Sequence, residues 1–171
     1  PVVISIRSFT QEYYNIDVIV RSIPAVQSAR PDAHYIIAGN EGDDALLREL
    51  AGELGLDERV HFVGRIQHEE LQCYLATSDA FLSVPSVDAT PVSLLEAMAC
   101  GAPVVVSALD SALEWVTHEE SGLVVEPRDR EALEGAVLRL INDRELSARL
   151  AKNALARVRE GADHSAHMRK M

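Results

Sequence analysis

Lysine is almost absent from this 171-residue sequence, since only Lys152 and Lys170 occur and both lie near its end. Acidic residues outnumber basic ones by 27 to 16, which gives a formal net charge of −11 at pH 7. The first hundred residues hold six Arg and fifteen acids. So acidic a surface repels nucleic acids and anionic membranes, and we exclude nucleic acid as a partner. An anionic ligand in this half must be held by arginine and backbone N–H groups.

Cysteine, aromatic residues and long apolar runs are scarce as well. Cys73 and Cys100 supply neither a disulfide framework nor a metal-ligand set, and they indicate a reducing compartment. We therefore expect the cytoplasm, with any contact to the inner membrane made by a domain outside this chain. No signal peptide or membrane-length apolar run is recognisable. Because the sequence enters a strand-like run directly after Pro1, we expect it to be one end of a longer protein.

Short apolar runs alternate with amphipathic stretches along the chain. The runs are nearly continuous in apolar residues, which predicts strands buried on both faces. They lie at 2–6, 34–38, 60–63, 80–84, 103–106 and 123–125. Helical spacing occurs at 16–29, 44–54, 68–77, 91–99, 130–142 and 144–159. This alternation predicts an α/β domain over 1–160, with a Rossmann-like parallel sheet of about six strands flanked by helices, and then a loose tail over 161–171.

The most informative segment runs from residue 85 to 106 and reads as a loop, a short helix and the next strand. In open α/β sheets, ligands bind at the carboxyl ends of the strands, where this loop lies. Thr90 should cap the helix and Pro91 should be its first residue. Free N–H groups at a helix start attract anions, so we expect the amides of Val92 and Ser93 to face a phosphate.

Glu96 stands in an otherwise apolar helix, between Leu95 and Ala97. A carboxylate in that position should be buried, and burying it without a partner would be costly. It must therefore accept hydrogen bonds, either from backbone N–H groups of a neighbouring loop or from two hydroxyls of a ligand. A ribose presents such a vicinal pair. The residues alone leave both interpretations open.

Two more charged residues flank the expected site. Asp88 precedes Glu96 by eight positions and lies in the loop before the helix. A loop aspartate is usually a turn or capping residue, but the two acids together could bracket a ligand. Arg7 directly follows the first strand. It is either a surface residue paired with Glu12 or Asp17, or a contact for a diphosphate.

Several longer strings carry a family resemblance that covers most of the chain. They are Ile-Ile-Ala-Gly at 36–39, Arg-Val-His-Phe-Val-Gly at 59–64, Ser-Asp-Ala-Phe-Leu-Ser-Val-Pro-Ser at 78–86, Leu-Glu-Ala-Met-Ala-Cys-Gly-Ala-Pro-Val-Val at 95–105, Glu-Trp-Val at 114–116 and Ser-Gly-Leu-Val-Val at 121–125. With them the chain resembles the C-terminal, nucleotide-sugar-binding domain of family 4 (group 1) glycosyltransferases, the retaining group with the GT-B fold. The acid–seven–acid motif of that family is matched by Asp88 and Glu96.

The resemblance implies a role for each matched residue, in hexosyl transfer from a UDP- or GDP-sugar to an unidentified acceptor. Asp88 would contact the hydroxyls of the donor sugar, Glu96 the ribose, and Arg7 the diphosphate, so that Arg7 and Asp88 are the catalytic candidates. The remaining donor-binding candidates are Gly39, Asn40, Arg65, Ile66, Ala89, Thr90, Val92 and Ser93. Arg65 and Ile66 would lie against the base. No cofactor or metal is expected, because basic residues and helix amides replace it.

Three positions depart from the family pattern. A lysine usually follows the arginine within a few residues, whereas residues 11–15 read Gln-Glu-Tyr-Tyr-Asn. The first acid is usually glutamate, and Asp88 is one methylene shorter. Glycines that are common after it are replaced by Ala89 and Pro91. These departures bear on donor affinity more than on the fold.

Other functions fit the same fold class. A phospho-receiver domain would need clustered acids after the first strand and a lysine after the fifth, where Arg7 and Ser107 stand, so we reject it. A non-catalytic binding or scaffold domain derived from a transferase remains an alternative, as does a GT-B-like sugar epimerase or phosphorylase. If the chain belongs to a glycosyltransferase, we expect an N-terminal acceptor domain outside this chain. The chain alone should then bind a donor without transferring its sugar.

Overall fold

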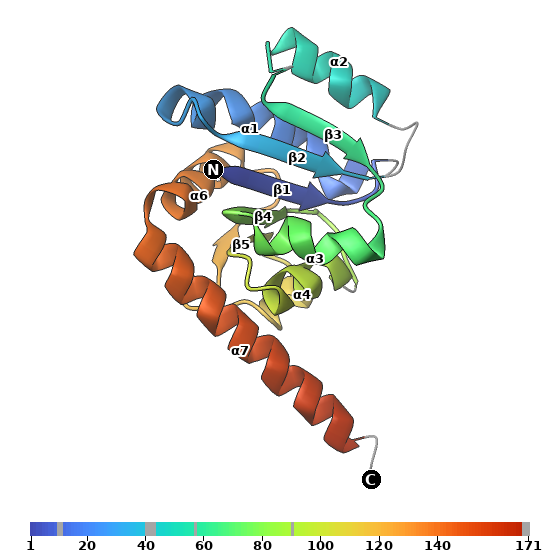
Figure 1. Ribbon diagram of the computed structural model, residues 1–171, viewed down its shortest axis with the longest axis vertical. Helices are drawn as coiled ribbons and strands as arrows, with labels where there is room; N and C mark the ends of the chain where they lie inside the picture. The colour runs from blue at the N-terminus through green and yellow to red at the C-terminus, as the bar shows by residue number, and fades with distance from the viewer. Residues whose placement is uncertain (10–11, 40–43, 57, 90, 169–171) are drawn as a thin grey trace.

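The computed structural model describes residues 1–9, 12–39, 44–56, 58–89 and 91–168. At its centre lies one six-stranded sheet, whose neighbouring strands all run parallel in the order β3-β2-β1-β4-β5-β6 (Figure 1). The strands are β1 (Val2–Ile6), β2 (His34–Ala38), β3 (Val60–Gly64), β4 (Ala80–Ser83), β5 (Val104–Ser107) and β6 (Leu123–Val125). The predicted Rossmann-like sheet of six strands is confirmed.

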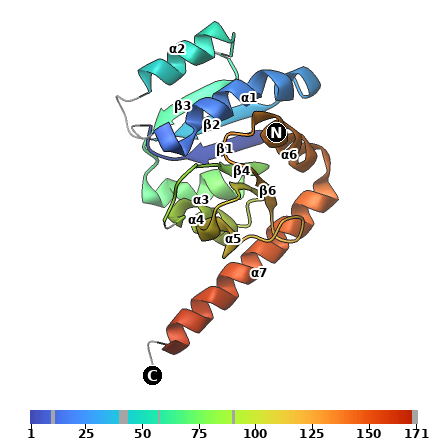
Figure 2. The same ribbon diagram turned by 180° about the vertical axis from the view of Figure 1, so that it is seen from behind.

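Helices cover both faces of the sheet. The crossover helices are α1 (Ile16–Ala29), α2 (Ala45–Glu53), α3 (His68–Ala76), α4 (Val92–Ala99) and the short α5 (Asp110–Leu113). The helices α6 (Arg130–Asn142) and α7 (Arg144–Met168) follow the last strand. A 3₁₀ turn, η1 (Glu12–Tyr14), precedes α1. The helices α1 and α6 lie on one face, and α3 and α4 lie on the other (Figures 1 and 2). Such double coverage explains why the strands read as continuous apolar runs.

Every strand except the edge strand β3 contributes to two apolar cores, one on each face, because successive side chains point to opposite sides. Val3, Leu82 and Val105 pack under α1 and α6. Their chain neighbours Ile4, Phe81 and Val104 pack under α3 and α4. Most of these side chains are fully buried and none carries a polar atom. Aliphatic packing therefore holds both layers, as the low aromatic content predicts.

Two predicted features of the helices are wrong. The helix α4 begins at Val92 with Pro91 as its cap residue, rather than at Pro91, and Thr90 lies outside the described residues. The expected loose tail from Gly161 is instead helical as far as Met168, where α7 ends. Extending an existing helix needs no new nucleation, so weak periodicity is no barrier to it. The structure also adds α5, which the sequence did not predict.

The strand order opens a crevice between β1 and β4. The chain leaves β1 for α1 on one face and leaves β4 for α4 on the other, so the loops after these two neighbouring strands diverge. Ligands of open α/β sheets bind at this kind of switch point. At the adjoining end of β2, a Cβ on Gly39 would lie 2.5 Å from the carbonyl oxygen of Arg7. Only glycine fits there, since the β1 loop crosses directly over it.

None of the helices in the described part of the chain is long and apolar enough to cross a membrane.

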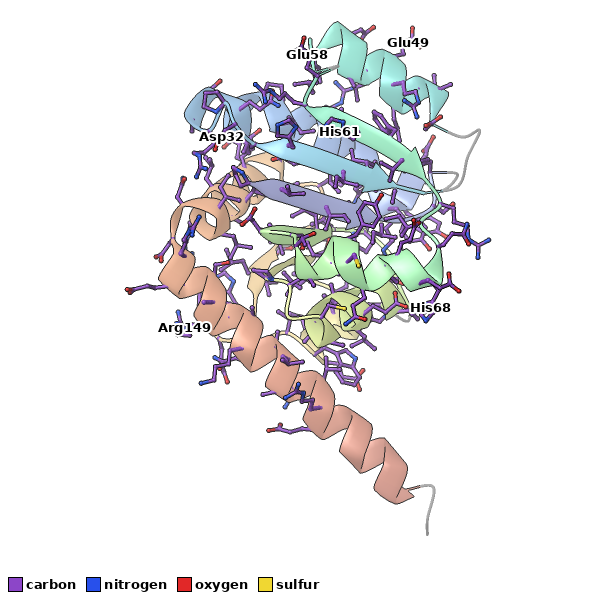
Figure 3. The ribbon with its side chains drawn as sticks, viewed as in Figure 1. Asp32, Glu49, Glu58, His61, His68 and Arg149 are labelled. Atoms are coloured by element: carbon purple, nitrogen blue, oxygen red, sulfur yellow. The ribbon has the colours of Figure 1, made fainter. Side chains whose placement is uncertain are left out.

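A histidine pair joins β2 to the edge strand β3, from which His61 projects (Figure 3). Arg59 Nη1 lies 3.0 Å from His34 Nε2, and His34 Nδ1 lies 3.1 Å from His61 Nε2. A guanidinium only donates, so His34 Nε2 accepts and His34 Nδ1 donates to His61. Burial, and then the nearby Arg59 and His61, lower the pKa of His34 below its usual 6.5.

We predict that acidification weakens the fold through His34. Because its pKa is lower in the folded chain, the unfolded chain binds more protons, so this part of the stability is present at about pH 7.5 and falls towards about pH 5. His34→Gln keeps an acceptor for Arg59 and removes the titration. Urea midpoints at both pH values should therefore change less in the variant. If the urea midpoint falls equally between the two pH values in the variant and in the unchanged chain, groups other than His34 cause the loss of stability.

Candidate functional site

A cleft of about 350 Å³ opens at the carboxyl edge of the sheet, beside the crevice between β1 and β4. In Figure 3 this edge is marked by His68, where α3 begins, and the opposite, amino edge by Asp32. Seven of the predicted site residues line the cleft: Arg7, Gly39, Arg65, Ile66, Val92, Ser93 and Glu96. They come from the ends of β1, β2 and β3 and from the first turns of α4. The topology thus gathers residues that are distant in sequence.

Arg7 is held by two partners at the end of β4. Its Nη2 lies 2.6 Å from Asp88 Oδ2 and donates to Ser83 Oγ at 2.9 Å. The side chains of Arg7 and Asp88 are 10 % and 9 % exposed, so the ion pair is buried. The alternative pairing of Arg7 with Glu12 or Asp17 is therefore wrong. Asp88 does not line the cleft itself but lies directly behind the arginine that does.

Tyr14 is a cleft residue that the sequence did not single out. Its ring lies 5.1 Å from Arg7 Cζ, within the range of a cation–π contact. It stands in the short stretch after Arg7 where the resembling family places a lysine. Ile6, Ser8 and Ala38 also line the cleft without having been predicted. The sequence could have indicated them, because they are chain neighbours of Arg7 and Gly39 at the ends of two strands.

Arg7 Nε and Ser93 Oγ are buried, and neither has a hydrogen-bond partner in the described part of the chain. Both belong to residues that line the cleft. Buried polar atoms are nearly always hydrogen-bonded, so orphaned ones require an explanation. A donor and a hydroxyl left open on one cleft are what a polar ligand would satisfy.

Glu96 is less buried than its apolar helix predicted. Leu94, Ala97 and Met98 carry the buried side of α4, whereas Glu96 is half-buried and faces the cleft with Val92 and Ser93. Among the residues that the structure describes, none forms a hydrogen bond or ion pair with its carboxylate. Burial, and then the charge of Glu96, raise the pKa of the Cys100 thiol. That thiol therefore stays protonated at neutral pH and offers no thiolate nucleophile.

The remaining cleft residues are supplied by the loop between β3 and α3. Gly64 ends β3 with a left-handed φ of 67°, which turns the chain so that Arg65 and Ile66 reach the cleft. Arg65 is exposed and forms no ion pair with any described residue. It is thus a cation of the cleft whose charge no described residue matches. Arg7, by contrast, is balanced by Asp88.

Among the described residues, two predicted ones, Asp88 and Ala89, are not part of this lining. Ala89 is exposed and lies outside the cleft. Asn40 and Thr90 lie outside the described residues. Their predicted roles stay predictions.

A larger hollow of about 560 Å³ lies at the amino edge of the sheet, near Pro1 and Arg144. Its Arg30 and Asp32 already form an ion pair at 2.9 Å, and Arg30 Nη1 also donates to the backbone oxygen of Ile141 at 3.0 Å. Its polar groups are therefore largely satisfied within the chain. Across the described residues, no group of three or more His, Cys, Asp or Glu side chains could hold a metal ion.

We predict that Arg7→Met lowers the free energy of unfolding by about 3–5 kcal/mol, because Asp88 would remain buried without its partner. The double variant Arg7→Met/Asp88→Asn should recover much of that loss, since no isolated charge remains. Urea denaturation of both single variants and the double variant gives the coupling energy. As a control, Arg139→Met breaks the exposed pair of Arg139 with Glu119 and should have little effect. If Arg7→Met is equally mild, the buried pair does not stabilise the fold.

Comparison with known proteins gives a consistent result. Residues 1–157 match the family model described as glycosyl transferases group 1. The GDP-mannose-dependent monoacylated alpha-(1-6)-phosphatidylinositol monomannoside mannosyltransferase of Corynebacterium glutamicum is 33 % identical over 135 residues, which cover 74 % of this chain and 34 % of that protein. The chain thus spans about a third of the length of this relative.

Solved structures share the fold over nearly the whole chain. The sucrose-phosphate synthase of Thermosynechococcus elongatus matches with a TM-score of 0.85 at 30 % identity, over 94 % of this chain and 41 % of that one. HepE of Anabaena, solved with UDP-glucose, matches with a TM-score of 0.82 at 23 % identity, over 93 % and 44 % of the two chains, and this likeness concerns the fold alone. Because the family model matches residues 1–157 and the sheet has the expected parallel order, the chain belongs to the group 1 glycosyltransferases.

Proposed function

We propose that this chain is the donor-binding domain of a glycosyltransferase that moves a sugar from a nucleoside-diphosphate sugar to an acceptor with retention. One observation carries the proposal: a carboxylate, a buried guanidinium N–H and a buried hydroxyl, none with a partner in the described part of the chain, belong to residues that line one cleft at the switch point of the sheet. Each is a group that a nucleotide could satisfy.

The ribose is assigned to Glu96. Its carboxylate reaches the cleft from the second turn of α4 and has two oxygens to accept the vicinal hydroxyls of a ribose. The alternative was that backbone N–H groups of the protein donate to the carboxylate of Glu96. No described residue does so. Arg65 and Ile66 lie at the end of β3, and there we place the base. The relative from Corynebacterium glutamicum is GDP-mannose-dependent, which favours a guanine nucleotide.

The diphosphate is assigned to the start of α4 and to Arg7. The amides of Val92 and Ser93 belong to the first turn of that helix, where N–H groups lack partners within the helix. Arg7 adds its open Nε. As the bond to the sugar breaks, the leaving diphosphate gains negative charge, and these donors stabilise it without having to move.

Asp88 is assigned to the sugar. Arg7 engages its Oδ2, and no described residue bonds to Oδ1, to which we assign a sugar hydroxyl. The ion pair thus holds the sugar-binding and diphosphate-binding groups in one rigid unit. The acceptor site would come from the rest of the protein, because the chain covers about a third of its relative. The domain alone should bind donor without turning it over.

We predict that Glu96→Gln weakens binding of UDP or GDP about ten- to a hundredfold, because hydrogen bonds to a charged group are lost. The fold should persist, since Glu96 is half-buried and has no partner in the described chain. Calorimetry of the 171-residue chain measures affinity, and thermal melting measures folding. Glu70→Gln, on the exposed surface of α3, is the matched control.

Two other results would redirect the proposal. If Glu96→Gln unfolds the chain and affinity per folded molecule is unchanged, Glu96 is a structural residue. If the unchanged chain binds neither UDP- nor GDP-sugars below millimolar concentration, a scaffold domain is favoured. Product analysis on the full-length protein separates transfer from epimerisation or phosphorolysis.

We also predict that donor binding needs no divalent metal, since arginines and helix amides supply the positive charge at the diphosphate. Calorimetric affinity for UDP or GDP should therefore agree within about twofold between EDTA and magnesium-containing buffers. A gain of an order of magnitude with magnesium would contradict this and would require carboxylate ligands in the cleft.

A further inference from the structure

Two residues in left-handed backbone conformation are joined across the fold. Among the described residues other than glycine, only Asn15, Glu119 and Arg128 have a positive φ, of 56°, 61° and 64°. Arg128 Nη1 donates to Asn15 Oδ1 at 2.9 Å, although 113 positions separate them. Asparagine tolerates this conformation, whereas arginine pays about 1–2 kcal/mol for it. Arg128 thus holds an unfavourable backbone conformation while its side chain bonds to Asn15. Strain of this kind is often retained at functional sites, which points to a role for the contact beyond stability.

Asn15 uses every polar atom it has. Its Nδ2 donates to the carbonyl oxygen of Val84 at 2.8 Å and to Ser86 Oγ at 2.9 Å, while Oδ1 accepts from Arg128. The carbonyl can only accept and the guanidinium can only donate, so the amide has one possible orientation. The side chain is 1 % exposed. It is therefore a fixed bridge between three chain segments.

Two of the bridged segments carry residues of the cleft or of the ion pair behind it. The loop after β1 holds Arg7 and Tyr14, and the loop after β4 holds Asp88. The backbone N–H of Ser86 also donates to the carbonyl oxygen of Tyr13, at 2.7 Å. Arg128 approaches from the turn between β6 and α6, and its Nη2 lies 3.4 Å from Asp17 Oδ2 at the start of α1.

We propose that Asn15 and Arg128 are positioning residues of the donor site, which fix the loops after β1 and β4 so that Arg7 and Tyr14 line the cleft and Asp88 lies behind Arg7. The inference rests on the proposed function and extends it to residues outside the cleft. Neither Asn15 nor Arg128 lines it. They act through the loops, and Arg128 does so from the turn between β6 and α6, as the only described side chain that bonds to the amide oxygen of Asn15.

Stability and positioning can be separated at Arg128. Its side chain is 56 % exposed, so its removal costs little buried apolar surface. Glycine would also relieve the left-handed strain at that position. The packing of α1 and α6 rests on other residues, among them Ile19, Ile23 and Val137, which are fully buried. A residue needed only for the fold would lose stability and affinity together.

The test compares Arg128→Gly with Glu119→Gly in the 171-residue chain. Both variants remove an exposed side chain from a left-handed position and break a surface ion pair, but Glu119 pairs with Arg139, away from the cleft. We expect Arg128→Gly to weaken UDP or GDP binding about three- to tenfold with a melting temperature like that of Glu119→Gly. Asn15→Gly should weaken binding at least as much, and Asn15→Gly/Arg128→Gly should add little further loss.

Amide hydrogen exchange gives a readout that does not depend on a ligand. In Arg128→Gly, the backbone amides of Val84 and of residues 86–89 should exchange faster than in Glu119→Gly. Unchanged exchange there, or nucleotide affinity equal in the two variants, overturns the positioning role. If the unchanged chain binds no nucleotide, the proposed function fails, and the exchange comparison alone decides whether Asn15 and Arg128 hold the loops.

Discussion

The buried contact between the ends of β1 and β4 is the constraint on which the cleft depends. These strands are neighbours only because the sheet is built outward from β1 in both directions, which brings Arg7 beside Asp88 and Ser83. A buried pair of this kind tolerates little movement, since displacing either partner leaves a charge without solvent. The loops that carry the two residues are thereby held at a fixed separation. The start of α4 and the loop after β3 complete the cleft around them.

Charge explains why the site takes this form. In a half of the chain with six Arg, fifteen acids and no Lys, an anion cannot be attracted by a general positive field. An anion bound in this cleft would have to be recognised by a few directed donors: amides at a helix start, an arginine whose direction is set by Asp88, and Arg65, which pairs with no described residue. Tyr14 lies against the guanidinium of Arg7, whose Cζ is 5.1 Å from the centre of the ring. Asp88 and Tyr14 together fix the placement of this guanidinium.

Much of the fold was readable in the sequence because both sheet faces are covered. Continuous apolar runs gave β1, β2 and β6 with their observed bounds, and helical spacing did the same for α1 and α6. At the site, Glu96 and Ser93 followed from a motif on a loop–helix segment. What escaped prediction depends on distant contacts: Tyr14 and Asn15 matter through Arg7, Val84 and Arg128, which no local pattern reveals. The half-exposed position of Glu96 likewise depends on how α4 is rotated against the sheet.

Trp115 offers a last consequence of the way α7 crosses the domain. It is the single tryptophan of the chain, and a Cβ on Gly161 would lie 2.6 Å from its ring, so helix and indole touch with nothing between them. The tryptophan fluorescence of the chain therefore comes from one known contact, between Trp115 and Gly161 of α7. The molecule contains its own optical probe for whether that helix stays docked, without any label.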